Sequence, residues 1–340
     1  MRTRHFSSSN PVPSPLDKAR GRPTHQPVLL HEVVRALDIQ PDDILVDATL
    51  GGAGHAKELS KGLGGNGLFI GLDADRDAIA RAEMRLSGAH ARVSLLHGNF
   101  RNMVNELAKL GVVSITKTLF DLGWSSYQLD SGRGFSFKAD EPLLMTYGSG
   151  DEGELTAATI VNTWGEESLA DIFYGFGGER YSRRIAKALV ERRKKKPFET
   201  SRDLAETIAA ATPARYRHGR IHPATRTFQA LRIAVNDELA ALTEGLQAAW
   251  QLLKPRGRIA VISFHSVEDR LVKRMFAQWE KNSEGKLLSK KPIIPSRQEE
   301  QENPRARSAK LRVIEKISIS HESPHTKNKQ IRPLDFSGEA

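Results

Sequence analysis

A short apolar run followed by a glycine-rich turn constrains the fold of this chain more than any other stretch. Residues Leu45–His55 read LVDATLGGAGH. The run Ile44–Val46 predicts a buried strand, and a helix should begin near His55. Three glycines between them let the backbone approach a ligand, and the first helical turn offers unpaired N–H groups. The stretch predicts a nucleotide site, although a tight turn without a ligand remains the alternative.

An acid at the end of the next predicted strand supports this interpretation. The apolar run Leu68–Leu72 ends at Asp73, about 20 residues after Gly54, where a carboxylate can accept hydrogen bonds from both ribose hydroxyls. The pair fits a dinucleotide or a nucleoside such as S-adenosylmethionine. The turn is not the G-x-G-x-x-G that holds a pyrophosphate, which favours the sulfonium nucleoside only weakly because that ligand has no phosphate.

Predicted strands and helices alternate four times before residue 125. The strands expected are Ile44–Val46, Leu68–Leu72, Val93–Leu96 and Thr116–Phe120. Short connections between them are typical of a doubly wound parallel α/β sheet, in which ligands bind beyond the carboxyl ends of the strands. The residues that follow these ends, Asp47, Asp73, Phe100 and Asp121, should therefore meet at one edge of the sheet.

The alternation stops after residue 125, and only helices are predicted between Thr156 and Thr212. The α/β pattern then returns, so the helical stretch should be an insertion of ordinary domain size. We expect a discontinuous α/β domain at 24–125 and 219–320. A helical, basic substrate domain should be inserted at 126–218, and residues 1–23 and 321–340 should be tails.

Local signals after the insertion give further expectations. These are a long helical stretch over Thr225–Leu253, a turn at Pro255–Gly257, a strand at Arg258–Ser263, a loose loop over Ser283–Asn303 and one or two closing strands within Lys310–Ser320. Thr200 with Asp203, and Ser266 with Asp269, have the spacing of capping boxes at helix starts. Asp269 and its neighbour Glu268 therefore need do no more than favour a helix N-terminus.

The charge of the chain indicates a polyanionic partner. Fifty-one basic against 41 acidic residues give a net charge of +10, which favours RNA or DNA over an acidic protein or a metabolite. The densest basic runs fall in the insertion, at 183–184, 192–196, 215, 217 and 220. Solvated helix faces are the usual meaning of such runs, but several beside a nucleotide site favour a grip on nucleic acid.

Absences in the sequence narrow the class further. The chain has no cysteine, which excludes disulfides and thiolate metal sites and fits a reducing cytoplasm. No apolar run has the length of a membrane span. Residues 1–23 lack the apolar core of a secretory signal, and a transit peptide is conceivable there, although three prolines favour a plain tail.

Several blocks together resemble one family in the same order along the chain. Among them are HQPVLL at 25–30, DATLGGAGH at 47–55, DLG at 121–123, RGFSF at 133–137, HPATRTFQA at 222–230, VNDE at 235–238, ISFHS at 262–266 and NPRARS at 303–308. The family is the bacterial 16S ribosomal RNA (cytosine-N4)-methyltransferases of the RsmH or MraW type. The resemblance runs from about His25 to Glu315.

The resemblance implies a class I S-adenosylmethionine-dependent methyltransferase fold, a Rossmann-like doubly wound sheet with an inserted all-helical domain. It implies methylation of N4 of a cytidine in the decoding centre of the small ribosomal subunit, with 16S rRNA as partner and S-adenosyl-L-methionine as cofactor. Carried over by position, the cofactor contacts are Ala53, Gly54, His55, Asp73, Phe100, Asp121 and Gln128. Such a transfer needs no metal and no covalent intermediate, because the sulfonium methyl is already activated.

Asp121 is the candidate catalytic residue. The N4 amine is a poor nucleophile, so the protein must supply in-line placement and an acceptor for the amine. Asp121 could be this acceptor or could hold the amino group of the cofactor, and the sequence leaves both roles open. The target base must leave its stack, and Trp124, Tyr127, Phe135 and Phe137 are candidates to receive it, with ordinary packing as the alternative for each.

The sequence departs from the family in the loop on the substrate side. Leu144 and Thr146 stand where an acid and an arginine are usual, and Trp124 and Tyr127 where a smaller residue and a proline are common. These changes leave open a non-catalytic RNA-binding assembly factor that keeps the fold. A nicotinamide oxidoreductase is a further alternative. However, this chain lacks the turn that such an enzyme uses to hold a pyrophosphate, and such an enzyme would not need the surplus of basic residues.

Overall fold

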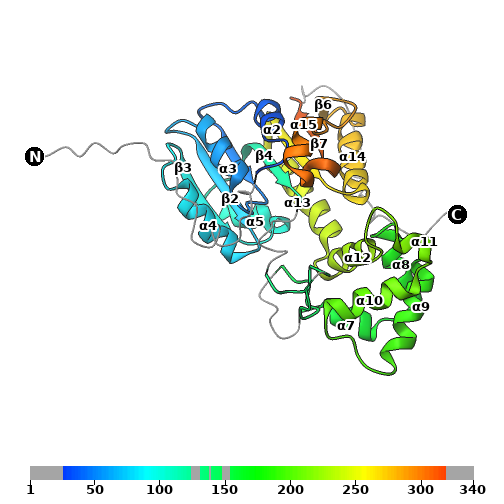
Figure 1. The fold of residues 1–340 in the computed structure, drawn as a ribbon. Coiled ribbons are helices and arrows are strands. Elements are labelled where there is room, and N and C mark those ends of the chain that lie inside the picture. Colours follow the sequence, from blue (N-terminus) through cyan, green and yellow to red (C-terminus); the bar gives the residue numbers. More distant parts are fainter. Residues whose placement is uncertain (1–25, 124–130, 138, 148–153, 319–340) are drawn as a thin grey trace, which may run out of the picture.

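The structure of the chain is a computed structural model that describes residues 26–123, 131–137, 139–147 and 154–318. An α/β body and a group of helices make up these residues (Figure 1). The helix α13 (Glu238–Leu252) lies at the side of the body that faces the helical group, and α12 (Thr225–Val235), which precedes it in the chain, lies in that group.

One seven-stranded sheet forms the centre of the α/β body, in the order β3-β2-β1-β4-β5-β7-β6. The strands are β1 (Ile44–Asp47), β2 (Leu68–Asp73), β3 (Arg92–His97), β4 (Ile115–Asp121), β5 (Leu253–Ser263), β6 (Gly285–Leu287) and β7 (Lys310–Lys316). Neighbours from β3 to β5 pair in parallel, and β7 is antiparallel to both β5 and β6. The expected doubly wound sheet of a class I methyltransferase is confirmed.

Helices cover both faces of the sheet because its central strands are apolar on both sides. The helices of the body are α2 (Leu30–Leu37), α3 (Gly54–Leu59), α4 (Arg76–Leu86), α5 (Met103–Ala108), α13 (Glu238–Leu252), α14 (Ser266–Lys281) and α15 (Arg297–Glu302). One core joins α5, α13 and α14 to the sheet, and a second joins α2, α3 and α4 to it. Strands buried on both faces are typical of parallel sheets.

A third core holds the helical group together. Its helices are α7 (Ala157–Thr163), α8 (Glu166–Gly175), α9 (Ser182–Arg193), α10 (Ser201–Ala211), α11 (Ala214–Arg217) and α12 (Thr225–Val235). Phe173, Leu189 and Ile208 are fully buried there, and Leu231 of α12 packs with them. A separate core fits an inserted domain, and the division at 126 and 218 stays a prediction.

The expected helical stretch over Thr225–Leu253 is confirmed, but it is interrupted, because α12 and α13 are separate helices. The break lies at Asn236 and at Asp237, whose φ of 48° is left-handed. The Asn236 side chain accepts a hydrogen bond from Tyr147 N and donates one to Met145 O, both at 2.8 Å. A contact with a distant loop therefore fixes the break, which the apolar periodicity of the sequence does not show.

Of two other local expectations, one is corrected. The turn expected at Pro255–Gly257 falls inside the bounds of β5, but the pairing with β4 skips it, from Leu253 to Arg258, and Arg256 has a left-handed φ of 64°. The segment expected as a loose loop contains β6 and α15. The short β6 is the edge strand of the sheet and is held by pairing with β7. A strand of three residues leaves no periodic signal in the sequence.

The two expected capping boxes have different outcomes. Thr200 caps α10 by accepting a hydrogen bond from Asp203 N at 3.4 Å, as expected. The box at Ser266 is wrong by one residue, because the N-cap of α14 is His265, whose Nδ1 accepts from Glu268 N at 3.3 Å. Asp269 instead pairs with Arg312 and Lys310 of β7.

Candidate active site

The carboxyl ends of the parallel strands meet at one edge of the sheet. The pairings of Asp47 with Leu119 and of Asp73 with His97 set these ends side by side. A cavity that is open to solvent at its mouth lies over this edge and is lined by Asp73, Phe100 and Asp121. The expected convergence of these three residues is therefore observed.

The glycine-rich turn forms the second wall of the site. Ala53 has a left-handed φ of 55° and is the N-cap of α3, which begins at Gly54. Gly54 and His55 line a second cavity that shares Gly51 and Asp121 with the first, whereas Ala53 lines neither. The two cavities are thus adjacent, and together they offer room for a ligand with two ends.

Gly54→Ala should lower the free energy of unfolding by about 1–3 kcal/mol, the usual cost of overpacking. A Cβ on Gly54 would lie 2.7 Å from Pro27 Cγ, so the segment around Pro27 must move. Urea unfolding measures the effect. Gly65→Ala is the matched control, since a Cβ there meets nothing within 4 Å; equal stability of the two variants would contradict the prediction.

Asp73 is placed and oriented as a ribose-binding acid would be. Its Oδ2 accepts from Gly51 N at 2.7 Å and its Oδ1 from Asp75 N at 2.9 Å. Burial raises the pKa of Asp73, which the two backbone hydrogen bonds partly oppose. Each carboxylate oxygen has two acceptor positions, so the carboxylate can still accept hydrogen bonds from a ligand in the cavity.

Phe100 supplies the apolar wall of the cavity. Its ring packs edge-on against Phe120, with centroids 5.5 Å apart. A Cβ on Gly245 of α13 would lie 2.5 Å from the ring, so α13 approaches Phe100 closely. Ala241 and Leu242 of the same helix line the cavity. An aromatic and aliphatic slot of this kind suits the flat ring of an adenine.

A buried charge network lies behind Asp121. The Nε2 of His55 is 2.9 Å from Val28 O, and its Nδ1 is 3.3 Å from Asp121 Oδ2. Both partners are acceptors, and the ring can donate to both at once only as an imidazolium. Burial lowers the pKa of His55, but the hydrogen bond and charge of Asp121, with Asp47, raise it overall.

The Oδ1 oxygen of Asp121 has surroundings different from those of Oδ2. Asp121 Oδ1 is buried without a hydrogen-bond partner among the residues that the structure describes, whereas the backbone N–H of Asp121 donates to Thr49 Oγ1 at 2.6 Å. An unsatisfied buried acceptor is costly in a protein at rest. It is therefore suited to a donor that a bound ligand brings, such as an amino group.

Asp47→Asn should stabilise the protein most at alkaline pH. Burial is the main reason that the pKa of Asp47 rises to about 7, so ionisation costs stability progressively as pH rises from 3.8 to about 7. Asn removes this cost and keeps the acceptor for Thr49 N. The gain in unfolding free energy should reach up to about 4 kcal/mol at pH 8.

The gain in unfolding free energy from Asp47→Asn should be smaller at pH 5, because Asp47 in the folded protein is then still mostly protonated. Urea unfolding of both proteins at the two pH values measures it. A gain that is the same at pH 5 and pH 8, or no gain, would show that Asp47 is not the group that titrates.

Several polar cavity residues were not expected from the sequence. Tyr147, Asn236, Glu238 and Glu268 line the same cavity as Asp73 and Asp121. They come from a loop, from the break before α13, and from the starts of α13 and α14. Membership of the blocks that resemble the family was a signal for Asn236, Glu238 and Glu268, whereas Tyr147 ends the segment that departs from the family.

The remaining expectations concern the loop that follows β4. Gln128, Trp124 and Tyr127 lie outside the described residues. Phe135 is buried and stacks on Tyr147 at 5.9 Å, and Phe137 stacks on His222 at 4.3 Å. Both phenylalanines therefore pack within the protein.

The two departures from the family that lie in the described residues, Leu144 and Thr146, are beside this packing. Leu144 is partly buried, and Thr146 is buried with a hydroxyl that has no hydrogen-bond partner within the described ranges.

No helix of the described part is both long and apolar enough to cross a membrane.

The strand order is that of a class I methyltransferase fold, and membership of the family below makes the chain a methyltransferase that uses S-adenosylmethionine. The residues of the cavity fit this cofactor: Asp73 can still accept hydrogen bonds, Phe100 offers a flat apolar wall, and Asp121 Oδ1 is an acceptor without a partner among the described residues. The chain belongs to the MraW methylase family, whose model matches residues 22–317.

Relatives are similar over nearly their whole length. The "Ribosomal RNA small subunit methyltransferase H" of Clostridioides difficile is 46% identical over 309 residues, which are 86% of this chain and 99% of that protein. The protein of the same name from Carboxydothermus hydrogenoformans is 45% identical over 313 residues, 87% of this chain and 99% of that protein.

Proposed function

We propose that this methyltransferase transfers the methyl group of S-adenosylmethionine to N4 of a cytidine in the decoding centre of 16S rRNA. The names of the relatives support a substrate in small-subunit rRNA, and the resemblance to the (cytosine-N4)-methyltransferases supports the base and its position. The observation that carries the chemistry is Asp121 Oδ1, a buried acceptor without a partner among the described residues, in a cavity shared with Asp73.

The proposed cofactor contacts divide between the two cavities. Asp73 accepts hydrogen bonds from the ribose hydroxyls and Phe100 packs against the adenine, while the turn at Ala53, Gly54 and His55 faces the methionine end. Gln128 is proposed from the resemblance alone. Asp121 lines both cavities, so it lies where the nucleoside and the methionine end would join.

Methyl transfer at this site requires placement and one acceptor. Bound S-adenosylmethionine would supply an activated methyl group: N4 would gain the methyl carbon, and the electron pair of the broken carbon–sulfur bond would remain with S-adenosylhomocysteine. N4 then loses one proton. Asp121 Oδ1 accepts a hydrogen bond from N4–H and orients the lone pair, and it can receive this proton at the end of the step.

The helical group supplies the proposed grip on RNA. Arg183 and Arg184 of α9, and Arg215 and Arg217 of α11, are exposed. Arg192 has a different role, because its guanidinium pairs with Asp203 and lies over Phe198. The exposed cations suit phosphate contacts that add affinity without sequence recognition. We place the enzyme with its ribosomal substrate in the cytoplasm.

Methyl transfer from tritiated S-adenosylmethionine to immature small subunits tests the proposal. After digestion of the rRNA, the label should be found in N4-methylcytidine. Label in another nucleoside would contradict the substrate assignment. Binding to the subunits without transfer would instead support a non-catalytic assembly factor, the reading that the departures at Leu144 and Thr146 leave open.

A further inference from the structure

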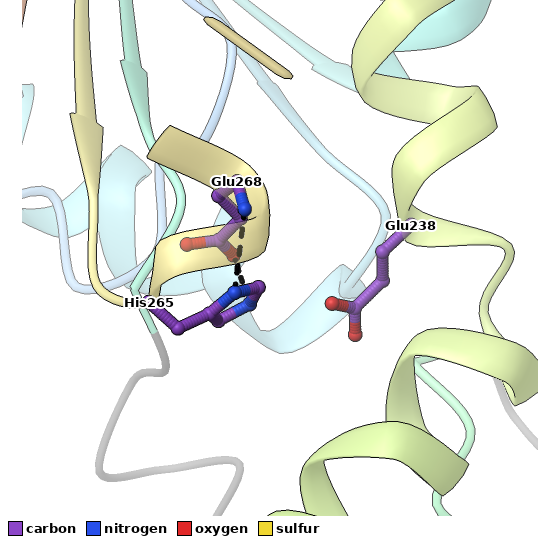
Figure 2. Close-up of side chains that lie close together, drawn as sticks. All are labelled: Glu238, His265 and Glu268. Carbon is purple, nitrogen blue, oxygen red and sulfur yellow. Dashed lines mark hydrogen bonds and ion pairs between the residues drawn. The ribbon is translucent and has the colours of Figure 1, made fainter. Parts of the chain in front are cut away.

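The main cavity over the strand ends is acidic. Of the described residues that line it, none is basic and four are acids, namely Asp73, Asp121, Glu238 and Glu268. Glu238 and Glu268 come from the starts of α13 and α14, and Figure 2 shows Glu238 pointing toward that end of α14. Like charges repel at short range, so this cavity is unsuited to a negatively charged group of a ligand.

The adjacent second cavity has a different balance of charge. Its described lining contains two basic side chains, His55 and Arg305, and one acid, Asp121. The methionine end of S-adenosylmethionine carries a carboxylate, whereas the adenosine and the sulfonium carry no negative charge. The two ends of the cofactor therefore match the two cavities only if the carboxylate lies in the second one.

The side chain of His55 is already engaged and cannot be the main partner of this carboxylate. Its ring is buried, and its two nitrogens lie 2.9 Å from Val28 O and 3.3 Å from Asp121 Oδ2. Arg305 is exposed and lines the cavity. A guanidinium has five N–H donors, so it can bind a carboxylate through two of them even when another donor is engaged.

Tertiary contacts hold the backbone of Arg305 beside the second cavity. Arg305 lies in the short 3₁₀ helix η3 (Pro304–Ser308), just before β7, whose first residues pair with the carboxyl end of β5. The next residue, Ala306, is fully buried in the core that contains α2 and α3. Asn303 Nδ2 donates to Gln26 O at 3.2 Å, and Gln26 lines the same cavity.

We propose that Arg305 binds the carboxylate at the methionine end of S-adenosylmethionine. The pair adds affinity and fixes which end of the cofactor enters which cavity, because the four acids of the main cavity would repel the carboxylate. This inference rests on the proposed division of the cofactor between the two cavities. It gives a role to the block NPRARS at 303–308, which the proposed function leaves without one.

A ligand without the carboxylate isolates this contact. Decarboxylated S-adenosylhomocysteine lacks only that group and keeps the amine. In calorimetric titrations, the unmodified protein should bind it about tenfold or more weakly than S-adenosylhomocysteine. Arg305→Met should lose about the same factor on S-adenosylhomocysteine, and it should bind the decarboxylated ligand as well as the unmodified protein does, because the partner of Arg305 is then absent.

Two further variants serve as controls. Arg307→Met is matched to Arg305→Met, since Arg307 is exposed on the same short helix and lines neither cavity; it should leave both affinities unchanged. Arg305→Lys keeps the charge without the planar fork, so it should recover only part of the affinity for S-adenosylhomocysteine. A merely structural role of Arg305 would instead weaken both ligands by the same factor.

Three results would overturn the inference. They are equal binding of the two ligands by the unmodified protein, undiminished binding of S-adenosylhomocysteine by Arg305→Met, and an equal loss on both ligands in that variant. If the unmodified protein binds neither ligand, the proposed cofactor site is wrong and this inference with it. If it binds both equally and Asp73→Ala weakens both, the site stands and only the role of Arg305 is wrong.

Discussion

Asp121→Asn should lower kcat for methyl transfer by about 10²–10⁴-fold, the usual range for a group that handles a proton at the reacting atom. The amide must direct its oxygen to the His55 Nδ1–H, which now pairs with Asp121 Oδ2. Its nitrogen, a donor, would then take the place of Oδ1, which is now a buried acceptor without a partner among the described residues. A substrate amine would meet a donor instead of an acceptor.

The same variant separates the two roles left open for Asp121. If the carboxylate holds the target amine, the affinity for S-adenosylhomocysteine should be unchanged while kcat falls. If it holds the cofactor's amino group, the dissociation constant should rise as well. Single-turnover methylation and calorimetry measure the two effects, and a variant with an unchanged rate would remove Asp121 from the mechanism.

Arg232→Met should destabilise the protein by about 3–5 kcal/mol, the cost of leaving buried charges without their partner. The guanidinium is 1% exposed and lies against Glu238 and Glu268. Burial alone would lower the pKa of Arg232, but Glu238, Tyr147 and Glu268 raise it overall, which keeps the side chain charged. Urea unfolding at neutral pH measures the loss.

A second substitution tests whether uncompensated charge is the cause. Arg232→Met combined with Glu238→Gln should recover part of the lost stability, because one of the two unpaired carboxylates is gone. Arg101→Met is the control, since Arg101 pairs with the exposed acids Asp237 and Glu244 and such pairs contribute about 1 kcal/mol or less. A similar loss in Arg101→Met and Arg232→Met would contradict the account.

The α/β body could be predicted because its signals are local. The run Leu68–Leu72 is apolar since β2 is buried on both faces, and it ends in Asp73 because the strand ends at the cavity. The rule that parallel strands share one carboxyl edge then places Asp73, Phe100 and Asp121 together. No contact between distant residues had to be known.

The part of the cavity that is lined by Glu238 and Glu268 could not be predicted in this way. Glu238 reaches it because the helix breaks at Asp237, and that break depends on hydrogen bonds from Asn236 to a loop about 90 residues earlier. His265 replaces the expected Ser266 as the cap of α14, since its ring can accept from Glu268 N. Both features are set by tertiary contacts, which a single sequence does not show.

The central claim is that the edge of the sheet holds S-adenosylmethionine through Asp73. Calorimetric titration with S-adenosylhomocysteine tests it most directly, in the unmodified protein and in Asp73→Ala. Two hydrogen bonds to a charged group are worth about 1.5–3 kcal/mol each, so the account predicts one site per chain, weakened at least 100-fold by the substitution. An equal dissociation constant in the two proteins would contradict it.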